Sequence, residues 1–329
     1  MHSSEQVDPQ ATGRQLGALS MGSVNGLSIH SARSVPYAQI ARGQGRTIVI
    51  VAHAGNDDIN AALVIAELMR EIQPDTVHGR IRLVSTLAPS LALEEEIRLR
   101  RTIIDNAIAG ADLVIELGGE LAHWDWCGAA ITHTSKTTSS STRLAEEARV
   151  AFGAPMSLKA LEQNNACSRP DICLEEEPNA NPMIRTIDSV GSLASACRLR
   201  GIAHLAICTG NSVAAIERQN MLRIGCRNVL VACKVLQENL TLRSSRLFRC
   251  EVERDSVLSP AAGALHMLTS PGREVYRGDL LAHIIDPKAP WRAPVPVQVP
   301  RNGVVMACRR GTIVAPGDGI ALLADEIQG

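Results

Sequence analysis

The chain has 329 residues, and 33 Lys and Arg side chains nearly balance 34 Asp and Glu side chains, for a formal net charge of −1. Without a basic excess or a basic run, the sequence predicts neither a nucleic-acid partner nor an anionic membrane partner. Hydrophobic residues make up 45% and charged residues 20% of the chain, which excludes wholesale disorder. At roughly 100–200 residues per domain, the length predicts about two domains.

The compartment is predicted from the N-terminal segment and the cysteines. No apolar run approaches the roughly 20 residues that cross a bilayer. The polar start MHSSEQVDPQATGRQ lacks the apolar stretch of a secretory signal. The nine cysteines are an odd number and form no CxxC pair, which in a chain of this length indicates buried free thiols in a reducing compartment. The sequence therefore predicts a cytoplasmic protein.

Extended and helical patterns alternate over the first three quarters of the chain. The polar residues 1–25 are expected to be loose or to form a peripheral strand. Continuous apolar runs predict buried strands at residues 46–52, 80–85, 111–117 and 204–208. Apolar residues at helical spacing predict helices at residues 59–72, 94–109, 142–152, 189–201 and 212–225. This alternation is typical of an α/β sheet with helices on both sides.

The last part of the chain, from about residue 247, has a different pattern of short strands with frequent Gly and Pro. An internal repeat is visible there: Pro260-x-x-Gly263 followed by Val275-x-x-Gly278-Asp279 recurs as Pro300-x-x-Gly303 followed by Val314-x-x-Gly317-Asp318. Gly-Asp turns between apolar pairs indicate hairpin-like units. We therefore predict an α/β domain at residues 1–245 and a small all-β domain, a barrel-sandwich, at residues 246–329.

Four segments occur in the order and spacing of one known family. They are VPYAQIARGQGRTIVIVAHAGNDD, HGRIRLVSTLAP, ADLVIELGG, and IAHLAICTGN with the following GCRNVL. On these segments the chain resembles the succinylglutamate desuccinylase/aspartoacylase family of carboxypeptidase-like zinc amide hydrolases. The resemblance implies a carboxypeptidase-like mixed sheet flanked by helices, a small β domain, and a relationship to N-acyl amino acid deacylases.

The resemblance also implies where the chemistry would be. In the family, a His and a Glu from the first loop and a His from the third strand bind zinc, and a further Glu transfers protons. Aligned without gaps, these positions carry Ala54, Asp57, Gly118 and Cys208. Ala and Gly cannot ligate a metal, and Asp places its carboxylate about 1.5 Å short of that of Glu. We therefore assign no catalytic residue, although Cys208 stands at the family Glu position, and expect no cofactor. The sequence predicts a zinc-site-degenerate pseudoenzyme, a non-catalytic binding or regulatory subunit.

An active amide hydrolase with a rearranged zinc site is the alternative. A one-residue shift in the first loop makes His53, with Asp57 or Asp58, the candidate metal ligands, and a third ligand would come from Glu116 or His123. Without a metal, His53 simply ends a strand and Asp57 or Asp58 caps the following helix. The expected partner is an N-acyl amino acid-like small molecule or an active paralogue. The chain is expected to form an oligomer.

A ligand pocket is predicted near the third strand. The candidate residues are Glu116, Glu120, His123, Trp124, Asp125 and Trp126. Two Trp rings there would form an apolar, water-excluding wall of a ligand pocket, or else pack under a loop or in a subunit interface. Cys208 and His204 lie on one strand about 13 Å apart by strand rise, too far for a nucleophile and its base. Cys208 is therefore expected to pack in the core.

Overall fold

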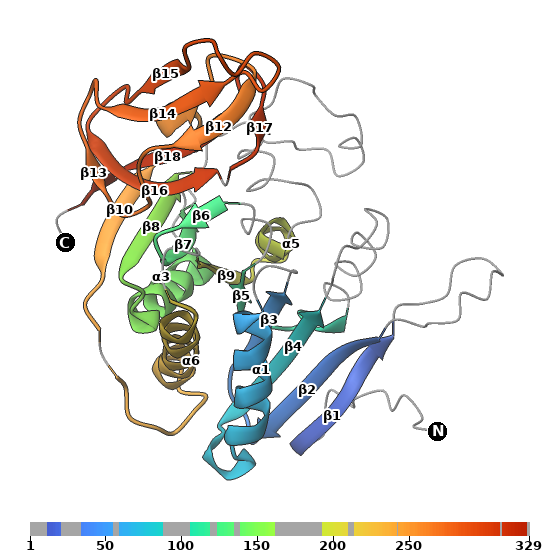
Figure 1. Cartoon of the computed structure of the whole chain (residues 1–329). Coiled ribbons are helices and arrows are strands. Elements are labelled where there is room, and N and C mark those ends of the chain that lie inside the picture. The colour runs from blue at the N-terminus through green and yellow to red at the C-terminus, as the bar shows by residue number, and fades with distance from the viewer. Residues whose placement is uncertain are drawn as a thin grey trace.

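The computed structural model of the chain describes residues 12–20, 34–54, 59–87, 106–118, 124–134, 139–161, 193–209, 214–241, 243–309 and 311–327. A large mixed sheet with helices on both faces carries a smaller all-β unit at one end (Figure 1). The predicted α/β fold with a small β part is confirmed. Within the described ranges, no helix is both long and apolar enough to cross a membrane.

The large sheet has 14 strands and runs through both parts of the molecule. Its order is β1-β2-β4-β3-β5-β9-β7-β8-β10-β18-β16-β13, with β11 paired to β18 and β6 paired to β16. The strands before the β unit are β1 (Gly13–Ser20), β2 (Ser34–Arg42), β3 (Thr47–Ala54), β4 (Gly79–Leu87), β5 (Leu113–Leu117), β6 (Trp124–Trp126), β7 (Ala129–Thr134), β8 (Met156–Leu161) and β9 (Ala203–Cys208).

The four predicted buried strands are confirmed as β3, β4, β5 and β9, and they are parallel to one another at the centre of the sheet. Their β-branched and aliphatic runs are buried because helices cover both faces. β1 lies at the sheet edge, antiparallel to β2, in agreement with a peripheral strand within residues 1–25. The short strands β6, β7 and β8 were not predicted.

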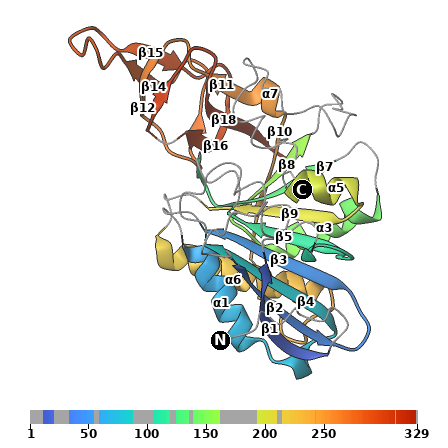
Figure 2. The ribbon, with the colours of Figure 1, turned by 90° about the vertical axis from the view of Figure 1, so that its right-hand side faces the viewer.

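The helices cover the sheet from two sides. They are α1 (Asn60–Glu71), the 3-10 turn η1 (Pro74–Thr76), α3 (Ser140–Phe152), α5 (Leu193–Leu199), α6 (Ala215–Ala232) and α7 (Val252–Asp255). α1, α3 and α6 share one apolar core with the sheet, while α5 packs on the other face, the side toward the β unit (Figure 2). The helix predicted over residues 94–109 lies largely outside the described residues.

The C-terminus of α6 differs from the sequence-based prediction. α6 continues past Gly225 to Ala232. Gly225 is not an end signal; a Cβ atom there would lie 2.5 Å from the Phe152 ring, so the glycine permits close packing against α3. α1 has Ile59 at its N-cap position, and Asp57 and Asp58, which were predicted to cap this helix, lie outside the described residues. In α3 the Ser139 hydroxyl accepts a hydrogen bond from the Thr142 N–H, as expected of a cap.

In the β unit, the two copies of the sequence repeat fold into two similar hairpin-like segments. Its strands are β10 (Arg246–Cys250), β11 (Ser256–Leu258), β12 (Gly263–Met267), β13 (Glu274–Val275), β14 (Leu280–Ile285), β15 (Val295–Gln298), β16 (Gly303–Arg309), β17 (Ile313–Val314) and β18 (Gly319–Glu326). In the Gly-Asp turns, the Asp279 carboxylate accepts the Tyr276 N–H at 2.8 Å and the Asp318 carboxylate accepts the Ala315 N–H at 3.0 Å. The same turn chemistry therefore closes both segments.

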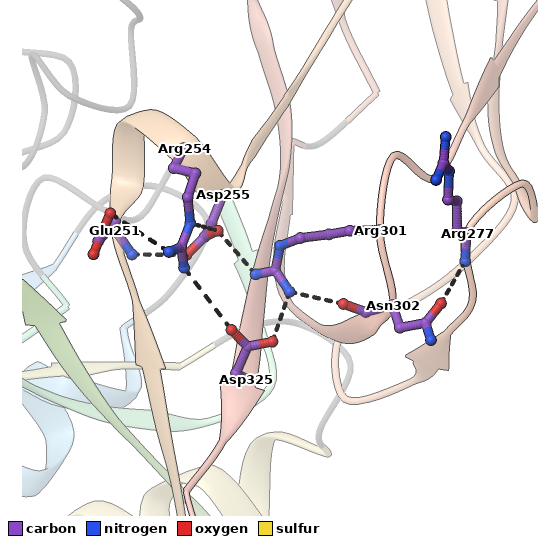
Figure 3. A network of polar contacts seen from close by, with 7 residues as sticks. All are labelled: Glu251, Arg254, Asp255, Arg277, Arg301, Asn302 and Asp325. Carbon is purple, nitrogen blue, oxygen red and sulfur yellow. Dashed lines mark hydrogen bonds and ion pairs between the residues drawn. The ribbon is translucent and has the colours of Figure 1, made fainter.

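A polar cluster around the buried Asp255 joins α7 to the strands of the β unit (Figure 3). The side chain of Asp255 has no exposed surface, and its carboxylate accepts hydrogen bonds from Arg254 at 2.8 Å and from the Glu251 N–H at 2.8 Å. Arg301 forms an ion pair with Asp255 at 3.0 Å and donates to Asp325 at 2.7 Å. The cluster thus connects α7 with the β15–β16 connection and with β18.

Candidate functional site

The residues at the family's chemical positions lie at one edge of the sheet. β3, β5 and β9 are parallel, so their carboxyl ends meet at this edge, where α/β sheets usually bind ligands. Ala54 ends β3, Gly118 directly follows β5, and Cys208 ends β9. The Gly118 N–H donates to the Ile207 carbonyl at 3.0 Å, which places Gly118 beside Cys208. Three of the four aligned positions therefore lie at this edge, and the fourth, Asp57, lies outside the described residues.

Cys208 is a buried, neutral thiol. It is 2% exposed and packs in an apolar cluster with Trp124, Trp126 and Phe248. Burial raises the pKa of the Cys208 thiol well above its usual value, and the nearby charge of Glu116 adds to the increase. A thiol in this environment is not a general base at neutral pH. The core-packing prediction for Cys208 is confirmed.

A buried acid–imidazole pair lies on the sheet face that α5 covers. The Nε2 atom of His204 lies 2.9 Å from the Oε2 atom of Glu116, and their side chains are 8% and 11% exposed. Both residues make further polar interactions. The sequence-based prediction paired His204 with neither Cys208 nor Glu116. The pair could have been predicted from the register of the adjacent parallel strands β5 and β9. In that register His204 lies opposite Val114 and thus close to Glu116.

The two tryptophans of the predicted pocket form the short strand β6. β6 pairs with β16 of the β unit, with Trp126 opposite Ala307 and Asp125 opposite Cys308. Trp124 is 4% and Trp126 1% exposed, so both rings pack between the large sheet and the β unit. Asp125 is half-buried and makes polar interactions.

Several candidate residues lie outside the described residues. These are Asp57, Asp58, Glu120, His123 and the side chain of His53. The backbone of His53 is described, in β3 opposite Thr86 of β4, one residue before the strand ends at Ala54. The site they were predicted to form remains a prediction.

The zinc ligands that the family resemblance implies do not fit the positions that the structure describes. Ala54 and Gly118 offer no side-chain donor atom, and Cys208 is a buried neutral thiol. Across the described ranges, no three His, Cys, Asp or Glu side chains lie close enough together to hold a metal ion. We therefore assign no chemical step to zinc.

Arg218 is a buried cation that the sequence-based analysis did not single out. It lies in the first turn of α6, the helix that follows β9, and is only 7% exposed. It makes polar interactions within the chain. One turn later, Met221 packs against Gly128, which precedes the β7 residue paired with Cys208. The start of α6, which carries Arg218, therefore lies near the edge that carries Cys208.

Comparison with solved structures shows that the chain shares the fold of proteins described as succinylglutamate desuccinylases or aspartoacylases. No protein-family profile matches the chain. It is 23% identical to the N-alpha-acetyl-L-2,4-diaminobutyric acid deacetylase of Halomonas elongata, over 99% of this chain and 95% of that protein. The product-bound ectoine utilization protein from Ruegeria pomeroyi superposes with a TM-score of 0.77, at 19% identity over 97% of both chains. A succinylglutamate desuccinylase/aspartoacylase from Rhodobacter sphaeroides superposes with a TM-score of 0.77, at 17% identity over 98% of both chains.

Proposed function

This chain has the fold of the succinylglutamate desuccinylase/aspartoacylase family and resembles its N-acyl amino acid deacylases, and from that premise we propose that it binds an N-acyl amino acid without cleaving it. It acts as a binding or regulatory subunit, in an oligomer with copies of itself or with an active paralogue. The binding site lies at the carboxyl edge of β3, β5 and β9.

What supports the proposal is the ungapped alignment, in which residues at this edge of the sheet differ from those that the family uses for catalysis. Ala54, Gly118 and Cys208 occupy positions where an amide hydrolase of this family needs two zinc ligands and a proton-transfer group. Hydrolysis of an amide needs an activated water and stabilisation of the charge that develops on the carbonyl oxygen. A methyl group, a hydrogen atom and a neutral thiol supply neither. A ligand held there keeps its acyl group.

Arg218 is the residue that we assign to the ligand carboxylate. A buried guanidinium favours a carboxylate partner, because its planar donors can form two parallel hydrogen bonds. The ligand carboxylate would join the polar interactions that Arg218 already makes. Binding then depends on this charge, whereas the acyl group contributes apolar contact.

The test combines calorimetry with an assay for released acetate, using Nα-acetyl-L-2,4-diaminobutyric acid as the probe. We expect the wild-type protein to bind the probe and to release no acetate, with or without added zinc. The Arg218→Gln variant should bind at least tenfold more weakly. The matched control, Arg223→Gln, changes a cation of the same helix that is 34% exposed and pairs with Glu67, and should bind as the wild type does.

Acetate release that a chelator abolishes would overturn the proposal in favour of the rearranged hydrolase. In that case His53→Ala should remove both the activity and a bound zinc ion. His78→Ala, which changes an exposed histidine next to β4, should remove neither. Absence of binding by the wild-type protein would contradict the proposed ligand class.

A further inference from the structure

The outer face of the small sheet in the β unit carries two histidines on neighbouring strands. This four-stranded sheet has the order β15-β14-β12-β17. His266 of β12 lies directly opposite His283 of β14, and Pro296 of β15 continues the same row. The neighbouring residues Leu265 and Ile284 point into the apolar core of the unit, so by strand alternation the two imidazoles point outward.

The two rings are near each other and accessible. Their centres are 6.5 Å apart and their planes are inclined by 44°. His266 is exposed and His283 is half-buried. Directly opposed residues of an antiparallel pair have Cβ atoms about 4.5–5.5 Å apart, so a rotamer change of the exposed ring is enough to aim both rings at one point.

The paired residues beside the histidines and on one side of them along this face are uncharged. The next row of the same face consists of Ile285, Ala264 and Ile313, and the row of the histidines ends in Pro296. None of these side chains is a cation that would repel a metal ion or a carboxylate that would attract a hard one. The ligand set that the face offers is two imidazole nitrogens.

We propose that His266 and His283 together bind one divalent transition-metal ion, with water in the remaining coordination positions. Imidazole nitrogen suits Cu²⁺, Ni²⁺ and Zn²⁺, whereas Mg²⁺ and Ca²⁺ prefer oxygen ligands. The ion links β12 to β14 and stabilises the β unit, because it binds the folded arrangement of the two strands. Protons compete with the metal for imidazole nitrogen, so affinity falls as the pH is lowered.

The test follows the Hε1 resonances of the nine histidines during titration of the full chain with Zn²⁺. We expect the His266 and His283 signals to shift together, with one midpoint, and Mg²⁺ at equal concentration to leave them in place. Replacement of either histidine by Ala should raise the midpoint of the remaining signal at least tenfold. The milder His266→Gln variant should have the same effect, and the control variant His78→Ala should leave the midpoint unchanged.

Two results would overturn the proposal. One is that neither signal responds to Zn²⁺. The other is that each signal keeps its midpoint when the partner is replaced, since two independent imidazoles would behave in that way. Neither result depends on the proposed binding of an N-acyl amino acid, because the assay uses the metal alone.

Discussion

Asp255 in the β unit and Glu116 in the central sheet are both buried acidic side chains. They differ in the groups that pair with the carboxylate. Asp255 accepts hydrogen bonds from Arg254 and from a backbone N–H and forms an ion pair with Arg301 (Figure 3). Glu116 lies 2.9 Å from a His204 nitrogen, on a sheet face that combines aliphatic side chains with the buried polar side chains of Gln39 and Arg82. Guanidinium groups stay charged at all working pH values, whereas imidazole exists in both forms near neutrality.

This difference in partners distinguishes the Asp255 cluster, which is structural, from Glu116, which lies near the candidate site. Burial alone would raise the pKa of Asp255, but the hydrogen bonds from Arg254 and the Glu251 N–H, with the charge of Arg301, lower it below its usual value. The Asp255 carboxylate is therefore stabilised in its charged form. Glu116 lies below the edge that carries Gly118 and Cys208, and its charge raises the pKa of Cys208.

The largest effect is expected at Asp255. Asp255→Asn keeps the size of the side chain but removes the charge that Arg254 and Arg301 share. Loss of one partner of a buried ion pair costs about 3 kcal/mol of unfolding free energy. Urea denaturation measures this loss. Asp325→Asn is the matched control, because Asp325 is 48% exposed and contacts the same Arg301, and it should lose less than about 1 kcal/mol.

The same substitution changes the response to acid. Because the pKa of Asp255 is lower in the folded state, its contribution is present above the unfolded value of about 3.9 and is lost as the pH falls through the lower, folded value. The Asn variant should therefore show less loss of stability than the wild type below about pH 4. Equal acid sensitivity in the two proteins would contradict the assigned role of the carboxylate.

A smaller effect is expected for the Glu116–His204 pair. Glu116→Gln and His204→Gln should each cost about 2 kcal/mol, and the double variant should cost less than the sum by about 1 kcal/mol. A double-mutant cycle in urea measures this coupling. The exposed pair Arg143 and Glu147 of α3 provides the reference, with a coupling of at most about 0.5 kcal/mol. If the two cycles give the same value, the buried pair has no special energetic role.

The smallest effect concerns the thiols beside the two carboxyl groups. Burial raises the pKa of Cys250, near Asp255, to about 12, and that of Cys208 well above its usual value. At pH 8 Cys250 therefore remains protonated, and the thiol is a poor nucleophile. Iodoacetamide should therefore leave both thiols unmodified in the native protein, as mass spectrometry can show. In Asp255→Asn, Cys250 should react before Cys208, and the reverse order would contradict the local nature of the cluster.

Much of the fold follows from local sequence patterns. The β-branched run of β3 and the helical spacing of α1 predict their elements, because each pattern depends on neighbours within a few residues. The repeat of the β unit was likewise visible in its Gly-Asp turns, since glycine there adopts a positive φ, 92° at Gly278 and 87° at Gly317, and the aspartate closes the turn. The order of these segments also indicated the family fold.

The buried contacts near the candidate site were decided by tertiary structure alone. Glu116 and His204 are 88 residues apart, and only the register of β5 against β9 brings them within 2.9 Å. Trp126 reaches the core because β6 pairs with β16 of the β unit. Side-chain chemistry could be read from the sequence, but which groups meet depends on strand pairing over long separations, and that pairing is set by the packing of the whole sheet.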